Sequence, residues 1–181
     1  MTHYSTAGQI PIGASSGFNL YAYTPVRKMR RDEIMQVSKD FGKAVRTAHA
    51  AGFDCVEVHA GHGYLISQFL SPYTNRRRDE YGGSLENRMR FMRMCLGEAV
   101  EAARACGMAI TVKHNMYDGF KGGIEIPESI EIESIANALP IVRKEIAATK
   151  KKKAVERSSI DQRIDYRWID LRTDENQLMF K

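Results

Sequence analysis

The sequence predicts an α/β fold with a parallel sheet, and two observations support this prediction. Apolar residues recur at three- and four-residue steps in two long segments, as they do on the buried face of an amphipathic helix. Each segment ends at a glycine and is followed at once by a short apolar run, which is typical of a strand in a covered parallel sheet. Helix and strand therefore alternate, and right-handed crossovers make the strands parallel.

The first predicted helix runs from Asp32 to Ala51, and Gly52 follows where a left-handed cap is needed. Its apolar positions are Ile34, Val37, Phe41, Val45 and Ala48. Residues 53–59 read as the first strand because they are short and rich in apolar and β-branched side chains. Residues 1–31 mix Gly, Ser, Thr, Pro and Tyr without a period, which is typical of a loop or a remnant strand, so we expect little regular structure there.

The second predicted helix runs from Ser84 to Ala105, and Ser84 is a good N-cap residue. A long loop rich in glycine, arginine and tyrosine precedes it. The next strand is predicted over residues 109–115. A third helix is predicted to begin near Pro127 and to end before Pro140.

Composition narrows the class of protein. With 43% hydrophobic and 27% charged residues, the chain can bury one ordinary core. No stretch approaches the roughly 18 apolar residues of a membrane span, and the N-terminus lacks a signal pattern, so we expect no membrane segment and a cytoplasmic location. The cysteines Cys55, Cys95 and Cys106 lie in apolar segments without CxxC spacing, which predicts buried, reduced thiols and no metal site.

The net charge of +5 is uneven along the chain. Residues 1–139 carry 16 Lys and Arg against 15 Asp and Glu, whereas residues 140–181 carry 11 against 7. We therefore expect a boundary near Pro140 that separates a globular domain, 1–139, from a charged, mainly helical or irregular tail, 140–181. The lysine run at 150–153 is the pattern of a solvated linker more often than of nucleic-acid binding.

Two histidines and a tyrosine, His59, His62 and Tyr64, follow the first predicted strand. Small residues separate them, so the chain can turn tightly at the C-terminal end of the strand, where barrels do their chemistry. Two imidazoles can donate hydrogen bonds to one oxygen that gains negative charge, and a nearby phenol can supply a proton. The alternatives are rim residues bonded to the backbone, or a metal pair, for which no third ligand has zinc-like spacing.

The stretch AGFDCVEVHAGHGYLISQFLSPYTNRRRDEYGGSLENRMRF, residues 51–91, is similar, nearly position for position, to the signature of the Old Yellow Enzyme and bacterial 2,4-dienoyl-CoA reductase family. ITVKHNMYDGFKGGI, residues 110–124, resembles the next strand and loop of that family, and IGASSG, residues 12–17, resembles the segment after its third strand. The resemblance covers about residues 10–139. It implies a partial (β/α)8 TIM-barrel with parallel strands.

The resemblance also implies roles for matched residues. His59 and His62 match the pair that holds the substrate's carbonyl or nitro oxygen, and Tyr64 matches the residue that protonates the neighbouring carbon. Lys113 matches the cation near flavin N1 and O2, and the alternative is a lysine paired with Glu57. The implied function is an FMN-dependent oxidoreductase of the ene-reductase type, which uses NAD(P)H to reduce small molecules with an activated alkene.

The resemblance also indicates that the barrel is incomplete, and it assigns a structural role to the loop that covers the site. A family barrel has eight strands and about 250 residues or more, whereas this chain supplies about three strands, so we expect an incomplete and inactive fragment. Uncovered sheet edges and apolar helix faces predict self-association. The following loop residues are interpreted as structural, because they fix the loop that covers the site: Arg76, Arg77, Asp79, Tyr81 and Arg88.

The tail carries a second resemblance. ERSSIDQRIDYRWIDLRTDENQLMF, residues 156–180, is similar to the segment that links the anticodon-binding and catalytic domains of aspartyl-tRNA synthetases. The alternative function is therefore a non-catalytic piece, associated with RNA or derived from an aminoacyl-tRNA synthetase. Two unrelated families joined near Pro140 indicate a chimera, a mis-joined gene or an artificial sequence.

Overall fold

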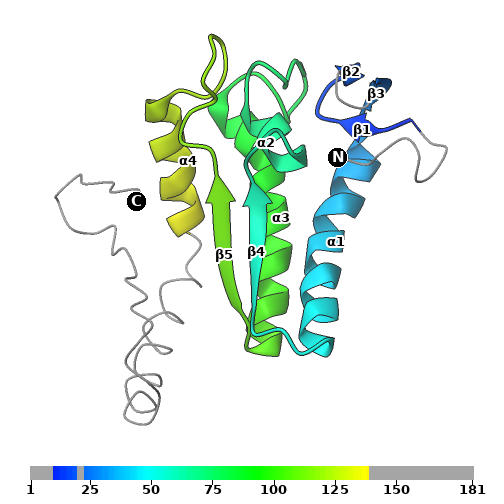
Figure 1. Cartoon of the computed structure of the whole chain (residues 1–181), viewed down its shortest axis with the longest axis vertical. Coiled ribbons are helices and arrows are strands. Elements are labelled where there is room, and N and C mark those ends of the chain that lie inside the picture. Colours follow the sequence, from blue (N-terminus) through cyan, green and yellow to red (C-terminus); the bar gives the residue numbers. More distant parts are fainter. Residues whose placement is uncertain (1–9, 20–22, 139–181) are drawn as a thin grey trace. The chain divides into compact units, whose positions relative to one another are not determined.

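A computed structural model describes residues 10–19 and 23–138. Its central feature is a parallel pair of strands, β4 (Cys55–Ala60) and β5 (Ala109–His114), whose register runs from Cys55 opposite Ala109 to Ala60 opposite His114 (Figure 1). This confirms the predicted α/β fold with parallel strands. The tail predicted for residues 140–181, its boundary and its resemblance to a synthetase lie outside the described residues and stay predictions.

Helix α1 (Arg31–Ala50) begins and ends within one residue of its prediction. The Glu33 side chain accepts the backbone N–H of Arg30 at 2.7 Å, which caps the first turn. The Arg27 guanidinium also donates to this carboxylate, and together these hydrogen bonds lower the pKa of Glu33 to about 2. Gly52 follows the helix with a φ of 88°, as its predicted capping role requires.

Helix α3 (Leu85–Cys106) likewise matches its prediction. The Ser84 side chain accepts the backbone N–H of Asn87 at 3.3 Å, and Gly107 ends the helix in the left-handed conformation. The helix packs against α1 and against β5. Its inner face supplies much of the apolar core, including Met89, Phe91 and Leu96.

The two faces of the β4–β5 pair differ in character. One face packs into the apolar core with Val58 and Ala60 buried, joined by Val56, Ile110 and Val112. Because side chains alternate along a strand, the opposite face carries Cys55, Glu57, His59, Thr111 and Lys113, which are exposed or half-buried. The described residues thus cover one face and leave the other open.

Two elements differ from the sequence-based expectations. The loop after β4 contains a short helix, α2 (Leu65–Leu70), whose apolar side chains are mostly buried. The N-terminal segment, for which little regular structure was expected, forms the small strands β1 (Ile12–Gly13), β2 (Gly17–Asn19) and β3 (Thr24–Lys28), in the order β1-β3-β2. These strands have only two to five residues each, which is too few for a periodic pattern to show in the sequence.

The remaining helix, α4 (Ile126–Ala138), follows the glycine-rich loop after β5, as predicted. The prediction of three buried cysteines was wrong for Cys55, which is exposed on the open face of β4. Cys95 is buried in α3, and burial raises the pKa of its thiol. None of the helices within residues 10–19 and 23–138 is long and apolar enough to span a membrane, and the cytoplasmic location stays a prediction.

Candidate active site

Strand β4 delivers His59 to the open side of the sheet. Val58 and Ala60, its two neighbours, are 4% and 1% exposed and anchor the strand in the core. His59 therefore points the other way, where it is half-buried. His59 is the last residue but one of β4, so its ring lies at the C-terminal edge of the sheet, where the sequence predicted a catalytic site.

A tight turn follows the strand and brings the next histidine back. His62 has a φ of 54° and Gly63 a φ of 71°, so two consecutive residues adopt the left-handed conformation. Gly61 has no side chain to obstruct this turn, whereas a Cβ there would lie 2.8 Å from the Asn115 Oδ1 atom. The small residues therefore have the role in the turn that the sequence indicated.

The turn places three rings together. The His59 and His62 ring centroids are 4.9 Å apart at an interplanar angle of 67°, and the His59 and Tyr64 centroids are also 4.9 Å apart. His62 and Tyr64 are exposed. The predicted proximity of the two histidines is confirmed, while their catalytic roles and that of Tyr64 stay predictions.

The hydrogen bonds of His59 decide which of its two ring nitrogens carries the proton. Its Nδ1 atom is buried and has no hydrogen-bond partner within residues 10–19 and 23–138. A neutral imidazole carries its proton on either nitrogen, and a partner of the other nitrogen usually selects the tautomer. Among the described residues, no hydrogen bond at Nδ1 selects the tautomer of His59. The described part of the chain also contains no group of three side chains suited to holding a metal ion.

Lys113 lies directly opposite His59 in the strand register. Both side chains belong to the open face of the sheet, and Lys113 is exposed. The alternative interpretation paired this lysine with Glu57, but in the part of the chain that the structure describes Lys113 forms no ion pair. As far as the described residues show, Lys113 thus stands opposite His59 without a carboxylate partner.

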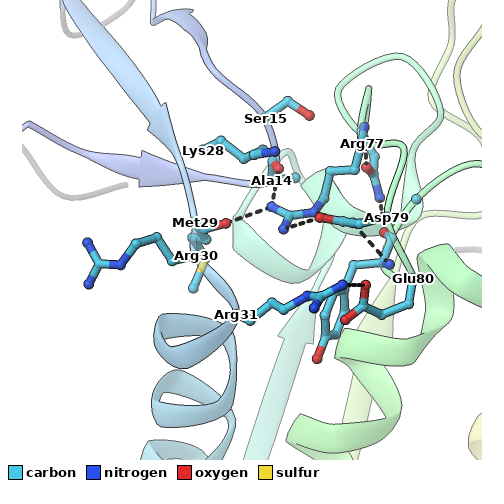
Figure 2. A network of polar contacts seen from close by, with 12 residues as sticks. Ala14, Ser15, Lys28, Met29, Arg30, Arg31, Arg77, Asp79 and Glu80 are labelled. Atoms are coloured by element: carbon cyan, nitrogen blue, oxygen red, sulfur yellow. Dashed lines mark hydrogen bonds and ion pairs between the residues drawn. The ribbon is translucent and has the colours of Figure 1, made fainter.

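The loop between α2 and α3 is held by buried arginine contacts (Figure 2). The Arg77 side chain is 1% exposed, and its Nη1 atom donates to the carbonyl oxygens of Ala14 and Met29, each at 2.9 Å. Its Nε and Nη2 atoms donate to Asp79 at 2.9 and 2.8 Å. Burial opposes ionisation of Asp79, but these bonds and the Tyr81 N–H outweigh it and lower the pKa of Asp79.

A second arginine ties this loop to α4. Arg88 donates from Nε to the Gly83 carbonyl oxygen at 3.2 Å and from Nη1 to that of Leu70, and it forms an ion pair with Glu128. Each of these two arginines directs four of its five N–H donors to protein groups, as a structural side chain does. The contacts support the interpretation of these loop arginines as structural. Arg76, by contrast, is exposed.

Sequence reasoning missed one residue of the site, Asn115. Its Oδ1 atom accepts the backbone N–H of His62 at 2.9 Å, across 53 positions of sequence. The only local signal was a polar residue directly after a strand, which is common at strand ends. His114, just before it, is half-buried, and its Nδ1 atom lies 3.1 Å from the Asn115 carbonyl oxygen and 3.5 Å from Ser129 Oγ.

Comparisons with known proteins agree with the family resemblance. A sequence profile described as the NADH:flavin oxidoreductase / NADH oxidase family matches residues 5–176. The chain is 47% identical over 98 residues to 12-oxophytodienoate reductase 1 of Oryza sativa, which covers 50% of the chain and 25% of that protein. It is 46% identical over 97 residues to an NADPH dehydrogenase of Geobacillus thermodenitrificans, covering 54% and 27%.

A solved structure shows the same arrangement. The Old Yellow Enzyme homologue from Zymomonas mobilis superposes with a TM-score of 0.62 at 28% identity, over 74% of this chain and 41% of that one. The chain spans about a quarter of the length of the curated relatives that it matches. Its strands and helices thus correspond to part of a TIM-barrel.

Proposed function

The chain belongs to the NADH:flavin oxidoreductase / NADH oxidase family, and on this premise we propose that His59 and His62 bind the oxygen of an activated alkene substrate during its reduction. The observation that carries the proposal is the pair of imidazole rings, 4.9 Å apart at the open end of β4. Two N–H donors aimed at one oxygen stabilise the negative charge that develops there as the conjugated C=C bond accepts hydride.

Tyr64 is the proposed proton donor. Its ring centroid lies 4.9 Å from that of His59, so its ring belongs to the same cluster. Reduction of an activated C=C bond places hydride on one carbon and a proton on its neighbour. A phenol beside the oxygen-binding histidines is suited to supply that proton.

Lys113 is the proposed contact to FMN. It lies opposite His59 on the open face, and no acidic side chain among the described residues forms an ion pair with it. A cation in this place fits a ring system that gains negative charge when reduced. Bound FMN would supply the hydride, with NAD(P)H as the reductant. The phosphate and ribityl contacts of the cofactor belong to other parts of a barrel.

The proposal is tested by enone reduction in a reassembled barrel. The chain is combined with FMN and with the complementary barrel segments of the Geobacillus NADPH dehydrogenase, and NADPH-dependent reduction of cyclohexenone is followed. Removing one oxyanion donor costs about 10²–10³-fold in rate, so His59→Ala and His62→Ala should each lose activity by that order. His49→Ala, which removes an exposed histidine of α1, is the matched control and should change nothing. Full activity in both site variants would refute the proposal.

For the 181-residue chain alone, we predict no measurable turnover even with excess FMN. The described residues offer chiefly Lys113 and the histidine pair to the flavin. Each charge-assisted hydrogen bond that is missing removes about 1.5–3 kcal/mol of binding free energy, and two such losses weaken binding by about two to four powers of ten. Steady-state turnover by the chain alone that disappears in His59→Ala would contradict this prediction, and would mean that self-association rebuilds the site.

A further inference from the structure

We infer that Asn115 is a positioning residue that holds the His62 backbone in its left-handed turn and thereby sets the spacing of the two histidine rings. The inference concerns the geometry of the pair, and its relevance to catalysis rests on the proposed function. It starts from an unusual conformation, because a residue other than glycine with a positive φ needs surrounding contacts that keep it there. His62 is such a residue.

Two hydrogen bonds hold this turn: the Tyr64 backbone N–H donates to the Gly61 carbonyl oxygen at 3.1 Å, and the His62 backbone N–H donates to Asn115 Oδ1 at 2.9 Å. Gly61 lies against the same Oδ1 atom, since a Cβ at Gly61 would be 2.8 Å from it. The carboxamide therefore occupies the space beside the turn and is the side chain that binds the His62 N–H. Asn115 directly follows β5, so it lies at the same end of the parallel pair as the histidines.

A second side chain fixes the orientation of that carboxamide. Asn115 Nδ2 donates to Asp118 Oδ1 at 3.0 Å, which leaves Asn115 Oδ1 facing His62. Asp118 Oδ2 in turn accepts the backbone N–H of Ile124 at 2.8 Å. Ile124 is 1% exposed and belongs to the apolar core. A continuous chain of hydrogen bonds thus runs from the core to the His62 turn.

The backbone of Asn115 is held from α4 as well. Its carbonyl oxygen accepts a hydrogen bond from Ser129 Oγ at 3.1 Å, and Ser129 is fully buried. The side chain and the backbone of Asn115 are therefore both linked by hydrogen bonds to buried parts of the structure. This is the arrangement expected of a group that positions another, because a freely rotating asparagine would impose no geometry on the turn.

Reversing the Asn115–Asp118 pair provides a sharp test. In the double variant Asn115→Asp with Asp118→Asn, the new carboxylate accepts from His62 N–H and from the new carboxamide, whose oxygen accepts from Ile124 N–H. All three hydrogen bonds are kept, with the same total charge. Asn115→Asp alone sets two carboxylates against each other, and Asp118→Asn alone leaves one of the three bonds unmade. Each single change should therefore disturb the turn, and the two together should restore it.

The readout is NMR of the isotope-labelled chain, without flavin or substrate. For Asn115→Ala, loss of one hydrogen bond should speed exchange of the His62 amide by about two- to tenfold and weaken the cross-peaks between His59 and His62 ring protons. The double variant should return both signals to their original values. Asn87→Ala is the control and should leave His62 unchanged. Asn87 is also half-buried, and its side chain also bonds to loop backbone, because its Nδ2 atom donates to the Gly82 carbonyl oxygen at 3.1 Å.

The outcomes separate this inference from the proposed function. Unchanged His62 exchange and ring cross-peaks in Asn115→Ala would overturn the inference, whatever the enzyme does. If Asn115→Ala does not fold, the reversed pair decides, since a double variant no closer to the original than its singles would overturn it equally. If the reversed pair restores the geometry while His59→Ala and His62→Ala leave enone reduction intact, the positioning role stands and the proposed function fails.

Discussion

Two polar segments of this chain differ in how their side chains are engaged. In the arginine-rich loop between α2 and α3, the buried side chain of Arg77 binds two backbone carbonyls and a carboxylate. At the end of β4, by contrast, the rings of His59, His62 and Tyr64 lie together, and those of His62 and Tyr64 are exposed. Side chains that bind protein groups indicate a structural role, and exposed polar rings gathered at a strand end indicate a site for a ligand.

The largest effect should come from Arg77→Ala. The substitution leaves two buried carbonyl oxygens and the Asp79 carboxylate without their donor, so the free energy of unfolding should fall by about 3–5 kcal/mol. Arg76→Ala is the matched control, because it removes the neighbouring, exposed arginine and should cost less than about 0.5 kcal/mol. Urea denaturation followed by circular dichroism measures both. Equal losses of unfolding free energy in the two variants would show that the buried Arg77 stabilises the fold no more than the exposed Arg76.

The second-largest effect should come from acid, which weakens the ion pair in the loop between α2 and α3. The pKa of Asp79 is lower in the folded chain than its ordinary value of 3.8, so its ion pair contributes stability that is present above that value. This contribution is lost as the pH falls from about 4 through the folded pKa. Asp79→Asn should flatten this part of the stability profile between pH 5 and pH 2, measured by thermal unfolding. An unchanged profile in that variant would show that the Arg77–Asp79 pair is not what acid removes.

The smallest effect on stability is expected from the histidine loop. The His62 ring is exposed, so His62→Ala should change the free energy of unfolding by about 0.5 kcal/mol or less. His59→Ala removes a half-buried ring that lacks a hydrogen bond at Nδ1, and it should cost about 1 kcal/mol. Losses as large as that of Arg77→Ala would mean that the histidines are structural as well.

Much of the fold could be predicted from the sequence because its signals are local. The periodic apolar residues of α1 and α3, the Ser84 cap and the glycines at 52 and 107 depend on residues within a few positions of one another. Helix α2 was missed because it has only six residues and no side-chain cap. Strands β1 to β3 were missed because each has only two to five residues, too few to show a periodic pattern.

The candidate site could be predicted only in part, because one of its contacts joins residues that are far apart in the sequence. His59, His62 and Tyr64 lie within six positions, and a strand followed by glycines was enough to predict that they converge. Asn115 lies 53 positions from His62, and its contact appears only when β4 and β5 are placed side by side. The partners of Arg77 are equally distant, at Ala14 and Met29.

The most direct test of the account is binding of a stable oxyanion to the histidine pair. 4-Nitrophenolate resembles a carbonyl oxygen that has gained negative charge, and its titration into the labelled chain is followed through the histidine ring resonances. The account predicts that the His59 and His62 signals shift together, that His49 and His114 do not, and that His59→Ala or His62→Ala weakens binding by about tenfold or more, the loss of one charge-assisted hydrogen bond. Equal shifts at His49, His59, His62 and His114, or unchanged affinity in both variants, would contradict it.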